Sequence, residues 1–234
     1  MQVVRSVNGF LQTLSASRLK HSVESPRLIT GFPAIDALAP SGGFATGAVH
    51  EVLSETGVPS LVLPVLVARI AAQSGWVIWC DLDRQFYPPG AATMGLPLER
   101  LVILRPANER EQLWAATECL RSAGVAACVV AQSRLTFVQA RRLQLAAERG
   151  GGVGLLLRPP DAVSRPYAAA TRWIVRPTAG ERTVQRWLVE LIHGHGGRVG
   201  QSVLLEVCRE THHVRATEAL AHRAGPTEKA AVSA

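Results

Sequence analysis

The stretch VHEVLSETGVPSLVL, residues 49–63, begins as a nearly continuous apolar strand and ends as the start of a helix. A short turn that contains Gly57 and Pro59 joins the two patterns. A strand, a turn and a helix in this order begin a crossover unit, in which the chain returns to add a parallel strand to the same sheet. The stretch therefore predicts an α/β fold with a parallel sheet.

The same alternation extends along the chain to about residue 160. Five runs are short and nearly continuously apolar, as expected of strands that are covered on both faces. These predicted strands are 48–53, 76–81, 101–104, 125–131 and 153–158. Predicted helices lie between them at about 61–73, 109–123 and 136–149. We expect a mostly parallel central sheet flanked by helices.

The two ends of the chain differ from this central part. Beyond residue 160, short strands separated by turn residues predict a small antiparallel extension on the sheet edge. These strands are 173–176, 183–191, 202–208 and 212–217. Residues 1–27 are predicted to form an N-terminal helical segment with one helix at 7–19, and the small, polar stretch 218–234 a disordered tail. The predicted domain is 28–217.

The predicted helix at 136–149 carries more apolar side chains than one face needs. Four of them share a stripe at helical spacing, and two lie outside it. The stripe is Phe137, Ala140, Leu143 and Ala147, and the others are Val138 and Leu145. Either the second face is also buried within the fold, which we favour, or it contacts a partner.

Composition limits the location and the chemistry of the protein. No run approaches 18 uncharged apolar residues and no secretory signal is recognisable, so we expect a cytoplasmic protein that does not enter a membrane. The four cysteines are widely spaced without a Cys-x-x-Cys pair, which predicts free thiols and no metal site. They are Cys80, Cys119, Cys128 and Cys208.

The chain carries a net charge of +7, and most of its cations are arginines. Arginine makes paired hydrogen bonds with both phosphates and carboxylates, so this charge favours contact with nucleic acid or with an acidic protein. Five arginines are candidates for weak DNA contact; the competing interpretations are a solvated rim or a protein interface, and we slightly favour the interface. They are Arg134, Arg141, Arg142, Arg158 and Arg165.

One stretch, LITGFPAIDALAPSGGFATGAVHEV at residues 28–52, resembles the start of a RecA-type ATPase core. The resemblance rests on a Thr-Gly, an Ile-Asp-x-x-Leu and a Gly-Gly-x-x-x-Gly pattern. The matching residues are Thr30, Gly31, Ile35, Asp36, Leu38, Gly42, Gly43 and Gly47. Further on, VIWCDLDRQF looks like the second strand of that core and ends with the acids Asp81 and Asp83. The resemblance implies a RecA-like core over about residues 28–158.

Two later stretches, ARRLQLAAERGGGVGLLLRPP and RWLVELIHGHGGRVGQSVLLEV, are similar to the ImuA family, RecA-like accessory proteins of bacterial mutagenic DNA repair. This family is similar in the same region to the SulA cell-division inhibitors. The resemblance implies a non-catalytic partner of an ImuB-type protein, which acts with an error-prone C-family polymerase and with a link to RecA. It also implies recruitment to the nucleoid after DNA damage.

The turn at residues 54–60 departs from a working phosphate loop. Such a loop needs inward-pointing N–H groups, a lysine for the phosphates and a Ser/Thr hydroxyl for Mg²⁺. When the chain is aligned on Gly57, Val58 replaces the lysine and Pro59 replaces the Ser/Thr and removes an N–H donor. Glu55 would repel a triphosphate, and Ser54 replaces the first glycine of the turn.

Other parts of an ATPase site are also missing. Ser60 could supply a hydroxyl only in a shifted register without a lysine, and the strand 125–131 ends without an aspartate. Without phosphate to act on, Asp81 is expected to cap the sheet end, and Asp83 to be solvated or paired with Arg84. His193 and His195, without a third ligand, are expected to be turn residues rather than metal ligands. We therefore predict no enzyme activity and no cofactor.

The stretch RPPDAVSRPYAAATRW, residues 158–173, lies where RecA proteins carry a long, glycine-rich DNA-binding loop. Because it is short and proline-rich, we expect no strand exchange. The function predicted first is an adaptor in translesion synthesis. The alternatives are a SulA-like cell-division inhibitor, a degenerate DNA-dependent ATPase that borrows a cation in trans, and a simple nucleic-acid-binding module.

Overall fold

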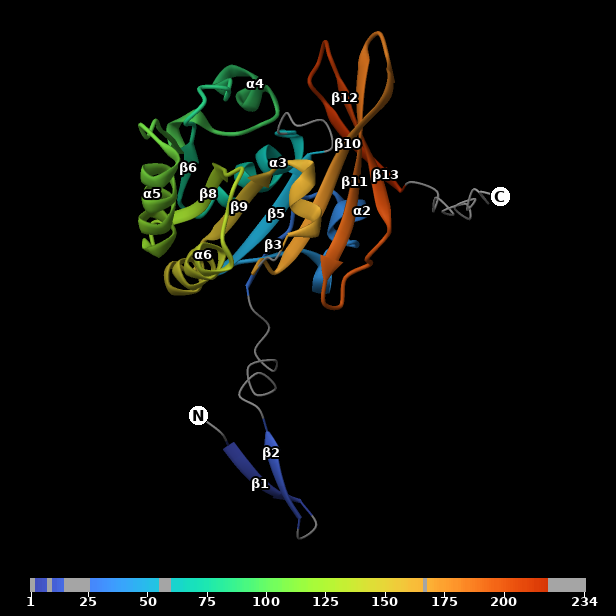
Figure 1. Ribbon diagram of the computed structural model, residues 1–234. Coiled ribbons are helices and arrows are strands. Elements are labelled where there is room, and N and C mark those ends of the chain that lie inside the picture. Colours follow the sequence, from blue (N-terminus) through green and yellow to red (C-terminus); the bar gives the residue numbers. More distant parts are fainter. Residues whose placement is uncertain (1–2, 8–9, 15–25, 55–59, 166–167, 219–234) are drawn as a thin grey trace, which may run out of the picture.

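A computed structural model describes residues 3–7, 10–14, 26–54, 60–165 and 168–218. At its centre a nine-stranded sheet runs in the order β13-β12-β11-β10-β5-β9-β8-β6-β7. Helices cover both faces of the half that carries β5 to β9, and the long strands of the other half extend to one side (Figure 1). The predicted fold class, a mostly parallel sheet with helices and an antiparallel extension, is confirmed.

The parallel half of the sheet consists of the strands that the apolar runs predicted. Their order in the sheet, β5-β9-β8-β6-β7, requires crossovers between them, and every neighbouring pair is parallel. The strands are β5 (Ala48–Ser54), β6 (Trp76–Cys80), β7 (Leu101–Leu104), β8 (Val125–Ala131) and β9 (Val153–Arg158). All seven residues of β5 and all six of β9 are buried, which explains why the runs show no polar alternation.

Helices α3 (Val62–Ala71), α5 (Glu109–Arg121) and α6 (Phe137–Gly150) cover the two faces of this half. Because strand side chains alternate between faces, Val77 and Trp79 of β6 join the core under α3. Their neighbours Ile78 and Cys80 join a second core under α5 and α6. Each face of β6 therefore meets a different helical layer, as the predicted alternation requires.

Local signals fix the ends of the two long helices that lie side by side in Figure 1. The side chain of Asn108 accepts the backbone N–H of Glu111 at the start of α5. Thr136 and Gln139 form a capping box at the start of α6. The same helix ends at Gly151, which has φ 82° in the left-handed region, where glycine is favoured.

Short elements complete the fold around these layers. They connect the longer strands and helices. They are β3 (Arg27–Leu28), α2 (Pro33–Asp36), η2 (Pro40–Gly42), β4 (Phe44–Ala45), α4 (Pro88–Thr93), η3 (Leu98–Arg100) and η4 (Pro160–Ser164). Thr30 and Asp36, both in the motif at residues 28–52, are bonded to each other, because Oγ1 of Thr30 donates to the Asp36 carboxylate at 2.9 Å.

The C-terminal half of the sheet is continuous with the parallel core. Strand β10 (Thr171–Glu181) pairs with β5 in parallel, and β11 (Val184–Gly194), β12 (Ser202–Cys208) and β13 (Val214–Glu218) follow in antiparallel order. The indole of Trp173 is fully buried and stacks on Phe44 with ring centroids 5.1 Å apart. The predicted extension is therefore present, and part of its apolar face belongs to the main core.

The N-terminal prediction is wrong where the structure describes it. Strands β1 (Val3–Val7) and β2 (Phe10–Leu14) form an antiparallel pair in place of a helix, and Val7 pairs with Phe10. The residues between this pair are Asn8 and Gly9, a dipeptide that favours two-residue hairpin connections. The rest of the predicted helix, 15–19, and the tail from 219 onward lie outside the described residues.

Candidate functional site

The degenerate phosphate loop follows the carboxyl end of β5, at the sheet edge where open α/β proteins bind ligands. Ser54 ends β5 and is buried, and Ser60 lies just before α3. The Ser60 hydroxyl is buried and has no hydrogen-bond partner within the described part of the chain. Residues 55–59, and with them Glu55, Gly57, Val58 and Pro59, lie outside the described residues, so their roles stay predictions.

Asp81 closes a turn of its own chain at the end of β6. Its Oδ1 accepts the backbone N–H of Gln85 at 2.9 Å and that of Phe86 at 3.2 Å, and its side chain is buried. Asp83 is exposed to solvent. The prediction that Asp81 caps the sheet end is confirmed. One oxygen of the Asp81 carboxylate is thus bonded to the protein backbone, and the other, Oδ2, is buried without a hydrogen-bond partner among the described residues.

Two small cavities lie next to this turn. One, of about 120 Å³, is lined by residues that include Leu61, Asp81 and Phe86. The other, of about 220 Å³, is lined by residues that include Asp83, Gln132 and Arg158. Ligand pockets usually measure about 300–1,000 Å³. These two cavities, as the described residues form them, fall below that range, whereas a third cavity, of about 360 Å³ and lined by residues that include Ser60, Val62 and Phe86, lies within it.

Gln112 of α5 was not singled out from the sequence, yet it holds two strand ends together at this edge. Its side-chain oxygen accepts the N–H of Leu82 after β6, and its side-chain nitrogen donates to the carbonyl of Ala131 at the end of β8. The signal was a polar residue on the inward face of an amphipathic helix. Its two intramolecular hydrogen bonds hold the end of β8 and the residue after β6 at a fixed separation.

A buried ion pair connects β5 with β10. The Arg172 Nε donates to the Glu51 carboxylate at 2.8 Å, and both side chains are at most 5% exposed. The Nη groups of Arg172 also donate to the carbonyls of Ala162 and Val163 in η4. Burial raises the pKa of Glu51, while the charges of Arg172 and Arg158 partly oppose that rise. The pair therefore fixes η4 against the sheet.

Arg158 does not belong to a DNA-contacting surface. It is 3% exposed, and its guanidinium donates to the carbonyl of Gln132 at 2.9 Å. The prediction that it could contact DNA or a partner is wrong, because β9 turns its side chain inward beside Glu51, a buried carboxylate that attracts it. A glutamate inside an apolar strand was the available signal for such an inward-pointing cation.

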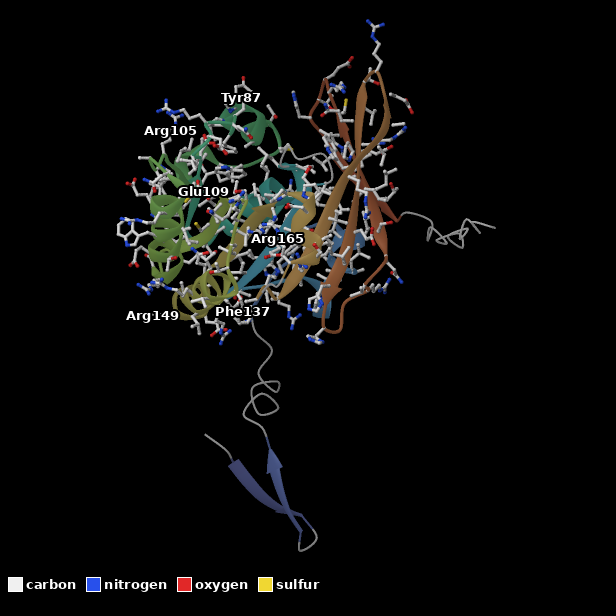
Figure 2. The ribbon with its side chains drawn as sticks, viewed as in Figure 1. Tyr87, Arg105, Glu109, Phe137, Arg149 and Arg165 are labelled. Atoms are coloured by element: carbon white, nitrogen blue, oxygen red, sulfur yellow. The ribbon has the colours of Figure 1, made fainter. Side chains whose placement is uncertain are left out.

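The other four candidate arginines do not form a single cluster. Arg134, Arg141 and Arg142 are exposed within or just before α6, and Arg141 approaches Glu148 at 3.6 Å. Arg165 follows η4 and forms an ion pair with Asp161; it lies in front of the sheet, away from the outer helices (Figure 2). DNA contact through these four side chains stays a prediction.

The remaining residues singled out from the sequence have ordinary roles. The rings of His193 and His195 meet edge to face with centroids 5.5 Å apart. The described ranges hold no group of three His, Cys, Asp or Glu side chains that could bind a metal ion. The four cysteines are free thiols, as predicted. Within the same ranges no helix is long and apolar enough to cross a membrane.

Sheet order and flanking helices define the class of protein, an α/β protein with a RecA-like core. The RadB recombinase crystal structure has the same fold, with a TM-score of 0.63 at 15% identity over 82% of this chain and 100% of that chain. The SulA family model, "Cell division inhibitor SulA", matches residues 47–154, which run from β5 into β9.

Curated relatives narrow the class to a family. The ImuA proteins of two strains of Caulobacter vibrioides are 33% identical to the chain over 77% of its length and 83% of theirs. The cell division inhibitor SulA of Edwardsiella piscicida is 30% identical over 47% of the chain and 68% of that protein. The chain belongs to the ImuA family.

Proposed function

We propose that the protein is a non-catalytic, RecA-like adaptor in error-prone translesion DNA synthesis. Membership of the ImuA family supports the pathway. The observation that carries the non-catalytic part is the contact of Asp81, whose Oδ1 closes its own turn by accepting two backbone N–H groups. In an ATPase of this fold the same edge of the sheet would present acids and a lysine to Mg²⁺ and phosphate.

Two further features support the absence of ATP chemistry. The turn at 54–60 carries no lysine to neutralise phosphate charge. The carboxylate of Glu55 would repel a bound triphosphate, and Pro59 has no N–H group where a backbone donor is needed. Arg158, a buried cation that lines the cavity beside Asp83, is bonded to Gln132 and attracted by Glu51. The turn therefore offers no lysine to a triphosphate, and the guanidinium of Arg158 is already engaged within the protein.

The proposed partner is an ImuB-type protein, through which the adaptor acts with an error-prone C-family polymerase and with RecA. Weak DNA contact through the exposed arginines is part of the same proposal. So is a cytoplasmic location with recruitment to the nucleoid after DNA damage. The RecA-like core supplies a rigid scaffold on which interaction surfaces replace the nucleotide site.

The proposal predicts nucleotide-independent binding of the purified ImuB-type protein. We expect a Kd on the order of 1 μM or tighter, unchanged within about twofold when Mg-ATP or Mg-ADP is added. The measurement is fluorescence anisotropy of the labelled ImuB-type protein titrated with the full chain. Absence of binding would reject the adaptor role, and binding that requires Mg-ATP would favour the degenerate ATPase.

The match to the SulA family model supports one alternative, an inhibitor of cell division. Overproduction in the host distinguishes the two. An inhibitor produces filamentous cells without DNA damage, whereas the proposed adaptor leaves division unchanged and raises damage-induced mutation only together with its partners.

A further inference from the structure

A groove of about 490 Å³ runs between α5 and α6 on the outer face of the molecule, on the opposite side of the sheet from α3. Leu113 and Trp114 of α5 line it with apolar surface, and Arg110 lies on the same helix one turn before Trp114. Gln139 and Arg142 line it from α6. It therefore combines an apolar floor with cations from both helices.

The apolar part of this surface is unusually exposed. The indole of Trp114 is 66% exposed. Val138 and Leu145, which share a face of α6 with Arg142 by helical spacing, are also exposed. We had favoured burial of this second face within the fold, and that prediction is wrong. Apolar side chains gathered in this way mark a surface that binds another molecule.

The carboxylates in the groove have partners within the protein, whereas two of its guanidinium groups form no ion pair with the described residues. The Glu111 carboxylate accepts hydrogen bonds from residues at the N-terminus of α5, and Glu118 pairs with Arg121 at 2.7 Å. Arg110 and Arg142, in contrast, form no ion pair within the described part of the chain. The carboxylates are already engaged while two guanidinium groups remain available, so the groove complements an acidic ligand.

We propose that the α5–α6 groove docks an acidic segment of a partner protein that carries a large apolar side chain. The apolar side chain packs on Trp114 and Leu113, and flanking Asp or Glu residues pair with Arg110 and Arg142. Arginine binds a carboxylate through two parallel hydrogen bonds, and exposed tryptophans and arginines are the side chains that most often dominate binding energy.

The charges argue against two other occupants. The two longest segments of this chain outside the described residues are basic: 15–25 holds two cations and one side-chain carboxylate, and so does 219–234. A nucleic-acid backbone would pass the carboxylates of Glu109, Glu111 and Glu118 along α5, whereas a peptide can place its acids against the two arginines alone. The groove would serve this role in whichever complex the protein acts, so a failure of the ImuB-type protein to bind would not remove it.

The test is an unbiased selection followed by measured affinities. Random 15-residue peptides displayed on phage are selected on the immobilised full-length protein, with counter-selection on Trp114→Ala. We expect enriched peptides with more Asp and Glu than Lys and Arg around a Leu, Met, Phe or Trp. A fluorescein-labelled consensus peptide should lose at least about tenfold in affinity with Trp114→Ala and with Arg142→Glu.

Two controls match these variants in chemistry and lie elsewhere on the molecule. Tyr87→Ala removes an aromatic ring that is 67% exposed just before α4, and Arg182→Glu reverses a charge in the turn between β10 and β11. Tyr87 lies at the top of the view in Figure 2, near α4. Both should leave the peptide affinity within about twofold, because neither touches the groove.

Three results would overturn the proposal. They are a selection without enrichment, enriched peptides that are neutral or basic, and affinities that do not change with Trp114→Ala and Arg142→Glu. A fluorescein-labelled single-stranded dT15 is titrated in parallel. If dT15 binds and loses affinity with Trp114→Ala, the groove is a nucleic-acid surface and the peptide proposal is wrong.

Discussion

Replacing Arg172 by methionine is expected to lower the free energy of unfolding by about 3–5 kcal/mol. The substitution leaves the Glu51 carboxylate, 2% exposed, without the guanidinium that lies 2.8 Å away. Removing one partner of a buried ion pair is among the costliest single changes in a protein interior, and the charge of Arg158 opposes the cost only in part. The carbonyls of Ala162 and Val163 also lose their donor, so η4 should loosen from the sheet.

Urea unfolding followed by circular dichroism measures this loss. The double variant Glu51→Gln/Arg172→Met removes both charges of the pair and should recover at least half of the lost stability, because neither partner is then left buried without the other. Arg121→Met, at an exposed pair on α5, should change the stability by less than about 1 kcal/mol. A loss of less than about 1 kcal/mol for Arg172→Met would contradict the role given to the ion pair.

Lowering the pH from about 7.5 to about 5 is expected to cost about 2 kcal/mol of stability through His50 alone. Burial lowers the pKa of this histidine to about 4. Its Nε2 lies 2.9 Å from the carbonyl of Ala45 and its Nδ1 2.6 Å from the Thr171 hydroxyl. The Trp173 indole also donates to that hydroxyl. The neutral ring, protonated on Nε2, satisfies all three groups at once.

The sign of this effect follows from the two pKa values. Between the unfolded value of 6.5 and the folded value of about 4, the unfolded chain binds a proton that the folded protein does not. Stability is therefore complete above pH 6.5 and is lost as the pH falls toward the folded pKa. The maximum loss from a shift of this size is about 3 kcal/mol.

Urea unfolding of the wild type and of His50→Gln at several pH values tests the assignment. The variant should be less stable at neutral pH, but its stability should change much less between about pH 7.5 and pH 5. His195→Gln, in the glycine-rich turn, should show the same dependence of the free energy of unfolding on pH as the wild type. Equal slopes for the wild type and His50→Gln would show that another group causes the pH dependence.

The parallel core could be predicted from the sequence because each of its strands has two covered faces. Residues 48–53 and 153–158 read as nearly continuous apolar runs, and β5 and β9 are buried throughout. The signals for the ends of α6 are also local in sequence. Thr136 and Gln139 form the capping box at its start, and the glycine after residue 150 ends it. These are short-range causes that a sequence displays directly.

The N-terminal strands were missed although their signal was local. Asn8 and Gly9 separate two short stretches, and Val7 pairs with Phe10 across them. The spacing of apolar residues in 7–19 was read as helical, but a two-residue Asn-Gly connection is a stronger indication of a hairpin than a weak period. Turn chemistry should have taken precedence over periodicity here.

The structure of the site depends on long-range pairs that no local pattern contains. Glu51 meets Arg172 across 121 residues of sequence, and this charge pattern draws Arg158 inward as well. The sequence shows a glutamate in an apolar strand, but not which of the many arginines compensates it. The exposure of Val138 and Leu145 also depends on tertiary packing, because the local sequence does not show whether another element covers this face of α6.

The most direct test of the central claim is a calorimetric titration of Mg-ATP, and then of Mg-ADP, into the purified full-length protein. A retired nucleotide site, in which Asp81 closes its own turn and the loop carries no lysine, predicts no saturable heat with either nucleotide. Saturable binding at micromolar concentrations that weakens with Asp81→Asn would contradict the account, because the site would then still hold a nucleotide.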